Sequence, residues 1–160
     1  MRKIAIDTEV LCELATVRGN APSPFWLDCQ ELARAHPGTL WVPLPAQKEF
    51  VAGTPTVERE RRREFLDRFA DRIIWPGDRS VEIIDQIVRV IGPLYRPEHG
   101  HKQRIKWDVA IVACAVEAGY DLCSRDGFLR RAYEAVKPPG GRVGPPDEFL
   151  PPQRALPGVE

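Results

Sequence analysis

Short apolar runs alternate along this chain with longer segments whose apolar residues recur every three to four positions. The runs have the length and β-branched content of buried strands, and the longer segments have the period of amphipathic helices. The runs predict strands at residues 3–6, 39–42, 73–75 and 122–124. The periodic segments predict helices at residues 8–17, 23–36, 46–52, 57–70, 80–92, 105–118 and 127–136.

Strands that alternate with helices indicate an α/β fold in which helices cover both faces of a central sheet. We therefore expect three layers, α/β/α, around a mainly parallel sheet of four to five strands, because Arg142-Val143 allows a fifth short strand. Right-handed crossovers gather the carboxyl ends of parallel strands on one edge, and ligands bind at that edge.

Serine, proline and glycine mark the expected ends of several helices. Ser23 and Ser80 are candidate N-caps, Pro93 ends the helix before it, and Gly119 is a candidate C-cap. The polar residues 96–104 are expected to form a loop, so the next helix is expected to begin at residue 105. One face of the helix at 80–92 is expected to carry Val81, Ile84, Ile87, Val88 and Ile91.

Four acidic residues lie where an expected strand passes into a helix. Asp7 ends the first strand, Glu49 follows the second strand by about one helical turn, Asp108 opens an apolar helix, and Asp126 follows the fourth strand. Each of them alone is better explained by an ordinary role, as a helix cap, a residue favoured by the helix dipole or a solvated helical side chain. Together, on one edge of a sheet, they would repel one another unless cations neutralised them.

Carboxylate oxygens suit Mg²⁺ or Mn²⁺, which bind through a few carboxylates together with waters and phosphate oxygens. One or two such ions can activate water and stabilise the leaving oxygen of a phosphodiester. The acidic quartet therefore predicts a metal site for phosphodiester chemistry that needs neither a histidine base nor a cysteine nucleophile.

The composition is that of an ordinary globular protein, with 43% apolar and 29% charged residues. A length of 160 residues predicts one domain, at residues 1–149, followed by a Pro-rich tail at 150–160 that we expect to be irregular. The formal net charge is zero, so no global basicity indicates nucleic acid, although a local basic patch remains compatible with it.

The four cysteines fit neither a CxxC motif nor zinc spacing, so we expect buried free thiols in a reducing compartment. Too few apolar residues follow Met1 for a signal-peptide core, and no apolar run has the roughly 20 residues that span a bilayer. A cytoplasmic location without a membrane partner is the expectation.

Four segments resemble PIN domains, a family of metal-dependent ribonucleases, over about residues 3 to 145. The segments are 4–8 (IAIDT), 47–50 (QKEF), 107–115 (WDVAIVACA) and 119–126 (GYDLCSRD). The resemblance implies that Asp7, Glu49, Asp108 and Asp126 are catalytic and hold Mg²⁺ or Mn²⁺. The layout looks closest to the VapC-type toxins, which implies an endoribonuclease that forms a homodimer and is held by an antitoxin whose tail blocks the acidic cleft.

Three residues beside the quartet are expected to support it. Thr8 follows the first acid, and Ser124 stands where the family often has threonine and keeps a hydroxyl that can hydrogen-bond the site. Glu9 departs from the family, which often has Asn or Ser there, and this extra carboxylate either joins the metal shell or faces solvent.

Positive charge lies directly before the third acid, where Lys102, Arg104 and Lys106 are candidate contacts for an RNA backbone. A mobile polar loop explains these residues equally well. The charged run at 58–64 is most simply a solvated helix face.

Two other functions remain open from the sequence. The same fold can serve as an RNA-binding or protein-interaction module without significant catalysis, against which the intact quartet argues. Phosphotransfer domains of the receiver or haloacid-dehalogenase type also place Asp at strand ends. However, receivers need a lysine after a late strand, and dehalogenases need an Asp where this chain has Glu9.

Overall fold

The structure, a computed structural model, describes residues 2–17, 21–52, 54–92 and 102–152, with the backbone alone for 102–106. The strands are β1 (Ile4–Ile6), β2 (Leu40–Pro43), β3 (Ile73–Ile74), β4 (Asp121–Cys123) and β5 (Val143–Gly144). The helices are α1 (Thr8–Ala15), α2 (Pro24–Ala35), α3 (Leu44–Val51), α4 (Thr56–Leu66), α5 (Ser80–Ile91), α6 (Lys102–Glu117) and α7 (Gly127–Val136), with short 3-10 turns η1 (Asp67–Phe69) and η4 (Pro146–Phe149).

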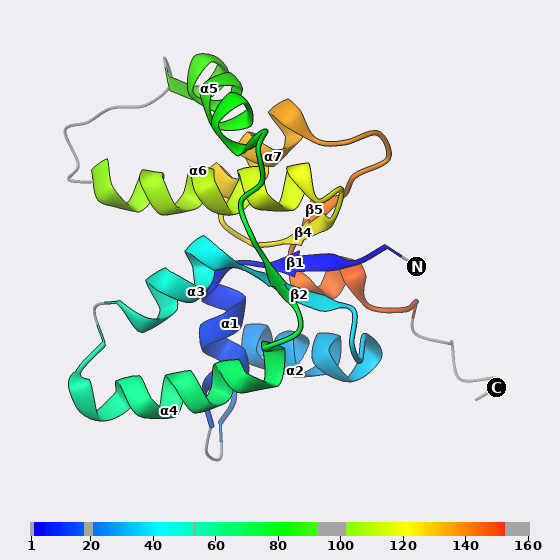
Figure 1. Ribbon diagram of the computed structural model, residues 1–160. Coiled ribbons are helices and arrows are strands. Elements are labelled where there is room, and N and C mark those ends of the chain that lie inside the picture. The colour runs from blue at the N-terminus through cyan, green and yellow to red at the C-terminus, as the bar shows by residue number, and fades with distance from the viewer. Residues whose placement is uncertain (1, 18–20, 53, 93–101, 153–160) are drawn as a thin grey trace, which may run out of the picture.

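The five strands form one parallel sheet in the order β3-β2-β1-β4-β5 (Figure 1). Ile4 pairs with Leu40 on one side and Ile6 with Cys123 on the other, so β1 is central. Helices α5, α6 and α7 lie on one face of the sheet and α1, α2 and α4 on the opposite face. The expected three-layer α/β/α architecture, including the fifth strand, is confirmed.

Burial in the core explains the continuous apolar pattern of the strands. All three residues of β1 are buried, and so are all three of β4. Burial on both faces is typical of parallel strands covered by helices, which explains their continuous rather than alternating apolar pattern. The helices add one apolar stripe each, among them the fully buried Leu11, Leu32 and Ile111.

The helix that carries Asp108 differs from the expectation, because α6 is already helical at Lys102. The expected polar loop therefore ends earlier, and Asp108 lies inside a helix instead of opening one. The residues at the start of α6 are mostly straight-chain polar residues, which favour a helix as strongly as many apolar ones do. Polarity alone was therefore a poor signal for a loop.

The buried face of α5 agrees with the expectation at Ile87 and Ile91 and differs from it elsewhere. Ile83, Ile87 and Ile91 point inward, whereas Val81 is 77% and Val88 is 50% exposed. Apolar residues cover about half of the circumference of this helix, so periodicity found the apolar side but not the part of it that packs on α6 and α7. Ser80 is the first residue of the helix, and its N-cap is Arg79.

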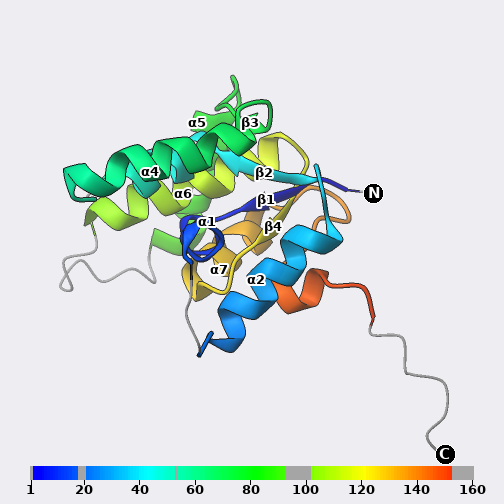
Figure 2. The same ribbon diagram turned by 90° about the horizontal axis from the view of Figure 1, so that it is seen from below.

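Chain ends and thiols complete the fold. The turn η4 packs against α2 (Figure 2). At the end of α2, Nε2 of the buried His36 lies 2.7 Å from the carbonyl oxygen of Phe149. All four cysteines are free, and Cys29, Cys114 and Cys123 are buried, as expected.

Within the described ranges, no helix has both the length and the apolar character needed to cross a bilayer.

Candidate functional site

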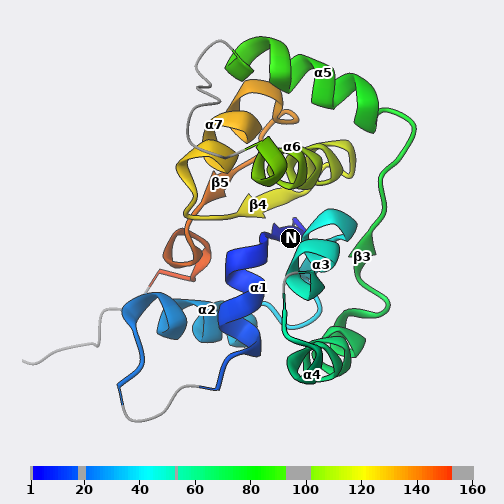
Figure 3. The same cartoon turned by 90° about the vertical axis from the view of Figure 1, so that its left-hand side faces the viewer.

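The candidate site lies where the direction of the sheet reverses. From β1 the chain builds outward to β2 and β3 on one side, and to β4 and β5 on the other. The gap beyond the carboxyl ends of β1 and β4 is therefore a topological switch point, the usual ligand position in open α/β sheets. In Figure 3, α1, α3, α6 and α7 gather around this end of the sheet.

All four acids of the predicted quartet line one cavity of about 230 Å³ at this switch point. They arrive on four different elements: Asp7 at the end of β1, Glu49 on α3, Asp108 on α6 and Asp126 before α7. Thr8, Glu9, Ile111 and Leu129 complete the lining. The fold thus brings together side chains separated by more than a hundred residues.

Asp7 is buried, with 1% of its surface exposed. It caps α1, because its carboxylate accepts a hydrogen bond of 2.8 Å from the backbone N–H of Val10. Burial raises the pKa of Asp7 from 3.8 to about 7, and the negative charges of Glu9 and Asp126 act in the same direction. Hydrogen bonds from Ser124 and Val10 oppose this rise in pKa only partly.

Ser124 connects two of the acids from a fully buried position. Its side chain hydrogen-bonds Asp7, and its hydroxyl oxygen accepts a 3.1 Å bond from the backbone N–H of Asp126. Asp126 in turn caps α7 by accepting bonds of 2.8 Å and 3.1 Å from the N–H groups of Phe128 and Leu129. The ordinary capping role is therefore real for Asp7 and Asp126, and it also fixes both carboxylates at the cavity.

Thr8 and Glu49 are joined directly, because the Thr8 hydroxyl donates a hydrogen bond to Oε2 of Glu49. Residues 41 positions apart are thereby held together, which orients Glu49 on α3 toward the start of α1. Glu49, the quartet member with the weakest sequence signal, is thus placed by a specific partner.

Asp108 reaches the cavity from the interior of α6, together with Ile111 three residues later. Residues three apart share one helix face, so this face of α6 forms a wall of the cavity. The interpretation that the helix dipole favours a carboxylate at position 108 is wrong. That effect is confined to the first turn of a helix, and α6 begins at Lys102.

Glu9 lines the cavity, but its carboxylate is engaged by Arg125. The Arg125 side chain donates two hydrogen bonds to Oε1 of Glu9, one of them 2.9 Å long from Nε. This contact raises the pKa of the Arg125 guanidinium, which also lies 3.7 Å from the ring centre of Phe25. No role for Arg125 was predicted from the sequence. The only signal for it in the sequence is its position next to Asp126.

The donor chemistry of the cavity fits a hard divalent cation, because its polar lining is made of carboxylates and one hydroxyl. Within the described part of the chain, no group of three or more Asp, Glu, His or Cys side chains is arranged so that it could hold a metal ion as the side chains stand. The hydrogen bonds that hold Asp7, Glu49 and Asp126 use only part of their lone pairs, so each carboxylate retains acceptor capacity.

The basic residues proposed to contact RNA have only their backbones described. Lys102, Arg104 and Lys106 lie in the first turns of α6, on the same helix as Asp108. Their side chains lie outside the described residues, so their role stays a prediction.

Comparison of the sequence with protein families and with curated proteins gives no match. Several solved structures are similar in fold, among them the following two. One is FitAB bound to an IR36 DNA fragment, with a TM-score of 0.60, 19% identity and coverage of 89% of this chain and 94% of that chain. The other is FitAcB from Neisseria gonorrhoeae, with a TM-score of 0.59, 18% identity and coverage of 89% and 97%.

The likeness extends over most of both chains, and it establishes that this protein has a PIN-like α/β fold. The resemblance seen in the sequence is therefore confirmed at the level of the fold.

Proposed function

We propose that this protein is a metal-dependent endoribonuclease that hydrolyses RNA phosphodiester bonds. The observation that carries the proposal is the convergence of four carboxylates, from four elements, on one cavity at the switch point of the sheet. Like charges gathered at a buried edge cost free energy, which is consistent with a site built to attract a cation.

Asp7, Glu49, Asp108 and Asp126 would hold one or two Mg²⁺ or Mn²⁺ ions, which supply an activated water and charge stabilisation at the phosphate. The other residues position these acids. Thr8 orients Glu49, while Ser124 orients Asp7 and holds the backbone of Asp126. Glu9 lines the same cavity as a supporting carboxylate, and Arg125 binds it through Oε1.

The proposal includes a role as the toxin of a toxin–antitoxin pair in the cytoplasm. Its support is the sequence resemblance to VapC-type toxins, together with the fold shared with FitAB and FitAcB. A homodimer and a cognate antitoxin are the partners that this reading implies.

Substitution of the acids tests the proposal. Asp7→Asn and Asp108→Asn should each lower metal-dependent RNA cleavage by about 100-fold or more. Loss of a charged metal ligand reduces activity more than loss of a residue that only hydrogen-bonds such a ligand. Asp78→Asn makes the same change at an exposed loop position and should cleave as the wild type does. Circular dichroism should show that all three variants keep the fold.

Unchanged cleavage in clean preparations of Asp7→Asn or Asp108→Asn would remove the assignment. An interaction module on the same fold would then be favoured, particularly if titration calorimetry detected no Mn²⁺ binding to the wild-type protein.

A further inference from the structure

A second depression of the surface, distinct from the acidic cavity, lies between α3, α4 and the end of β3. This groove has a volume of about 920 Å³. Its apolar lining comes from all three elements and includes Leu44, Val51, Leu66 and Ile73. Lys48, Arg59, Arg63 and Trp75 lie on the same surface. We call it the α3–α4 groove.

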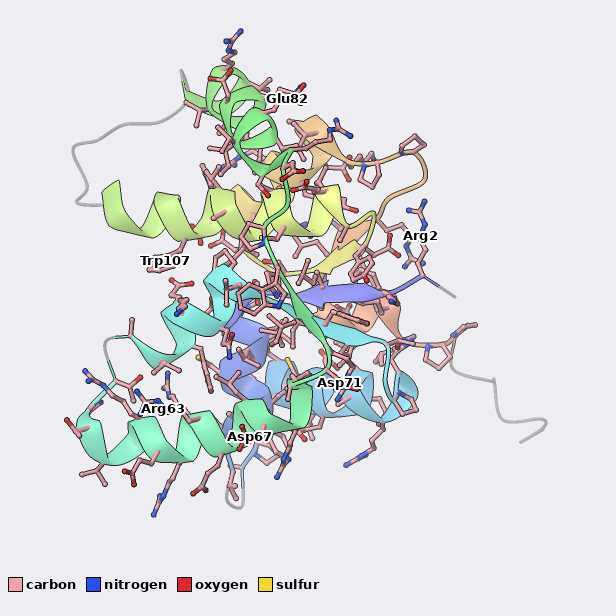
Figure 4. All side chains as sticks on the ribbon, in the orientation of Figure 1. Arg2, Arg63, Asp67, Asp71, Glu82 and Trp107 are labelled. Atoms are coloured by element: carbon pink, nitrogen blue, oxygen red, sulfur yellow. The ribbon has the colours of Figure 1, made fainter. Side chains whose placement is uncertain are left out.

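Positive charge dominates the polar lining of the α3–α4 groove. Lys48, Arg59 and Arg63 face a single carboxylate, that of Asp67. Among the described residues, the partner of Arg59 is a neutral group, since its Nε donates a 2.8 Å hydrogen bond to the carbonyl oxygen of Thr54. Of the described side chains, none forms an ion pair with Lys48 or Arg63, and Figure 4 shows Arg63 on α4 beside α3.

Other described arginines, such as Arg61 and Arg142, also form no ion pair with a described residue, but here three cations share one groove with a single carboxylate. Several arginines elsewhere are neutralised by carboxylates, as in the pairs Arg89–Asp85 and Arg125–Glu9. Uncompensated cations that share one groove produce a local positive field, which attracts a polyanion.

Trp75 adds an aromatic surface to the groove. It follows β3, one of the two edge strands of the sheet, and 69% of it is exposed. A large exposed indole beside cations is the combination by which proteins hold single-stranded nucleic acid, because bases stack on the ring while cations meet the phosphates.

The groove adjoins the acidic cavity through α3. Neighbouring residues on a helix point about 100° apart, and accordingly Lys48 lines the groove while Glu49 lines the cavity. An RNA strand is repelled by four carboxylates, so it needs positive surface beside the cavity to remain bound.

We propose that the α3–α4 groove binds a segment of single-stranded RNA that flanks the phosphate in the acidic cavity. Trp75 stacks on a base, and Lys48 and Arg63 contact backbone phosphates. The inference rests on the proposed ribonuclease function and names the part of the surface that holds its substrate.

The test measures binding of fluorescent single-stranded oligouridine, by anisotropy with Mg²⁺, to full-length Asp7→Asn protein, in which cleavage is suppressed. Adding Arg63→Glu should weaken binding by about tenfold or more and reduce its salt dependence. Arg61→Glu is the matched control, because it makes the same charge change on α4 at an exposed residue outside the groove. It should retain affinity within about twofold.

Substitution of Trp75 gives a second, independent test in the same binding assay. Trp75→Ala should weaken binding by roughly 5- to 100-fold, whereas Trp75→Phe, which keeps an aromatic face, should retain most of the affinity. Val81→Ala removes an equally exposed apolar side chain away from the groove and should have no effect.

Cleavage by otherwise wild-type protein separates the two proposals. Groove variants should raise KM for RNA with kcat little changed, whereas substitutions of the quartet remove kcat. If the wild type cleaves RNA but Arg63→Glu and Trp75→Ala match the controls in affinity and KM, the groove assignment is overturned while the ribonuclease stands. Binding of an acidic peptide there, with RNA affinity unaffected by the same variants, would equally overturn it. Absence of any metal-dependent cleavage by the wild type would instead overturn the proposed function.

Discussion

Asp7 is a carboxylate that folding removes almost completely from water. Its side chain keeps two hydrogen bonds, from Val10 and Ser124, but they do not offset the loss of hydration, and its pKa rises to about 7. Near neutral pH the protein therefore holds a carboxyl group that is poised between its charged and neutral forms. A buried acid of this kind lowers stability at the position where a cation would be bound.

The sign of the pH dependence follows from the two pKa values. Between pH 3.8, the ordinary pKa, and about 7, the folded state binds more protons at Asp7 than the unfolded state does. The contribution of Asp7 to the free energy of unfolding therefore falls as pH rises through this window, and it stays low above pH 7.

We therefore predict that Asp7→Asn stabilises the metal-free protein at alkaline pH. The gain in the free energy of unfolding should be small near pH 4 and should grow to about 3–4 kcal/mol at pH 8, since one pKa unit corresponds to about 1.4 kcal/mol. Asparagine can still cap α1 through its amide oxygen. Urea unfolding in EDTA at several pH values measures the difference, and a gain independent of pH would contradict the account.

At the residue scale, the sequence identified the acids that line the cavity but not how they are held. Capping at Asp7 and Asp126 was expected from their positions before helices. The pair Glu9–Arg125 joins residues 116 positions apart, and no local pattern specifies such a contact.

At the scale of elements, α5 is anchored to α6 by a carboxylate that the sequence did not single out. Glu117, at the end of α6, accepts hydrogen bonds from the backbone N–H groups of Gly77 (3.1 Å) and Arg79 (2.8 Å) and from the Ser80 hydroxyl. The bond from Ser80 is the main reason that the pKa of Glu117 is lowered. Glu117 thus accepts from backbone N–H groups just before α5, where no carbonyl of the helix is available as an acceptor.

We predict that Glu117→Ala lowers the free energy of unfolding by about 1–2 kcal/mol, the scale expected for several partly exposed hydrogen bonds. Glu117→Gln should lose less, because its amide oxygen still accepts. Glu64→Ala removes an exposed glutamate from α4 and serves as the matched control.

Because the pKa of Glu117 is lowered on folding, its contribution is present above its ordinary pKa and is lost as pH falls through the folded value. Thermal unfolding near pH 7 and near pH 3 should show the effect of Glu117→Ala shrinking in acid. An effect of equal size at both pH values would argue against the role of the charged carboxylate.

Sequence patterns placed every helix and strand of the described chain within a few residues. The errors have a common physical origin. The start of α6 and the inward face of α5 both depend on which neighbours the helix packs against, and local composition contains little information about those neighbours.

At the scale of the whole molecule, the sheet order decides where the acids meet. Only an order in which β4 pairs with β1 places Asp126 beside Asp7. The backbone N–H of Asp7 confirms this adjacency with a 3.3 Å hydrogen bond to the carbonyl oxygen of Cys123. Any cation held between these strand ends would connect both halves of the sheet.

We therefore predict that Mn²⁺ stabilises the entire fold. A ligand at about 100 times its Kd adds about 2.7 kcal/mol to the free energy of unfolding, which corresponds to a rise in Tm of about 5–10 °C for a domain of this size. Asp126→Asn should abolish most of the shift, while Asp78→Asn should preserve it. An equal shift in the wild type and Asp126→Asn would place the ion elsewhere.

The sequence by itself determined the alternation of strands and helices, the order of the four acids and the capping at Asp7 and Asp126. These features depend on periodicity and on hydrogen bonds between near neighbours, which are written locally in the chain. The tertiary structure alone decided that the acids share one cavity, that burial raises the pKa of Asp7, that Arg125 binds Glu9, and that Lys48, Arg59 and Arg63 line one groove with Trp75. Each of these requires strands and helices distant in sequence to pack together, and burial and charge are properties of that packing.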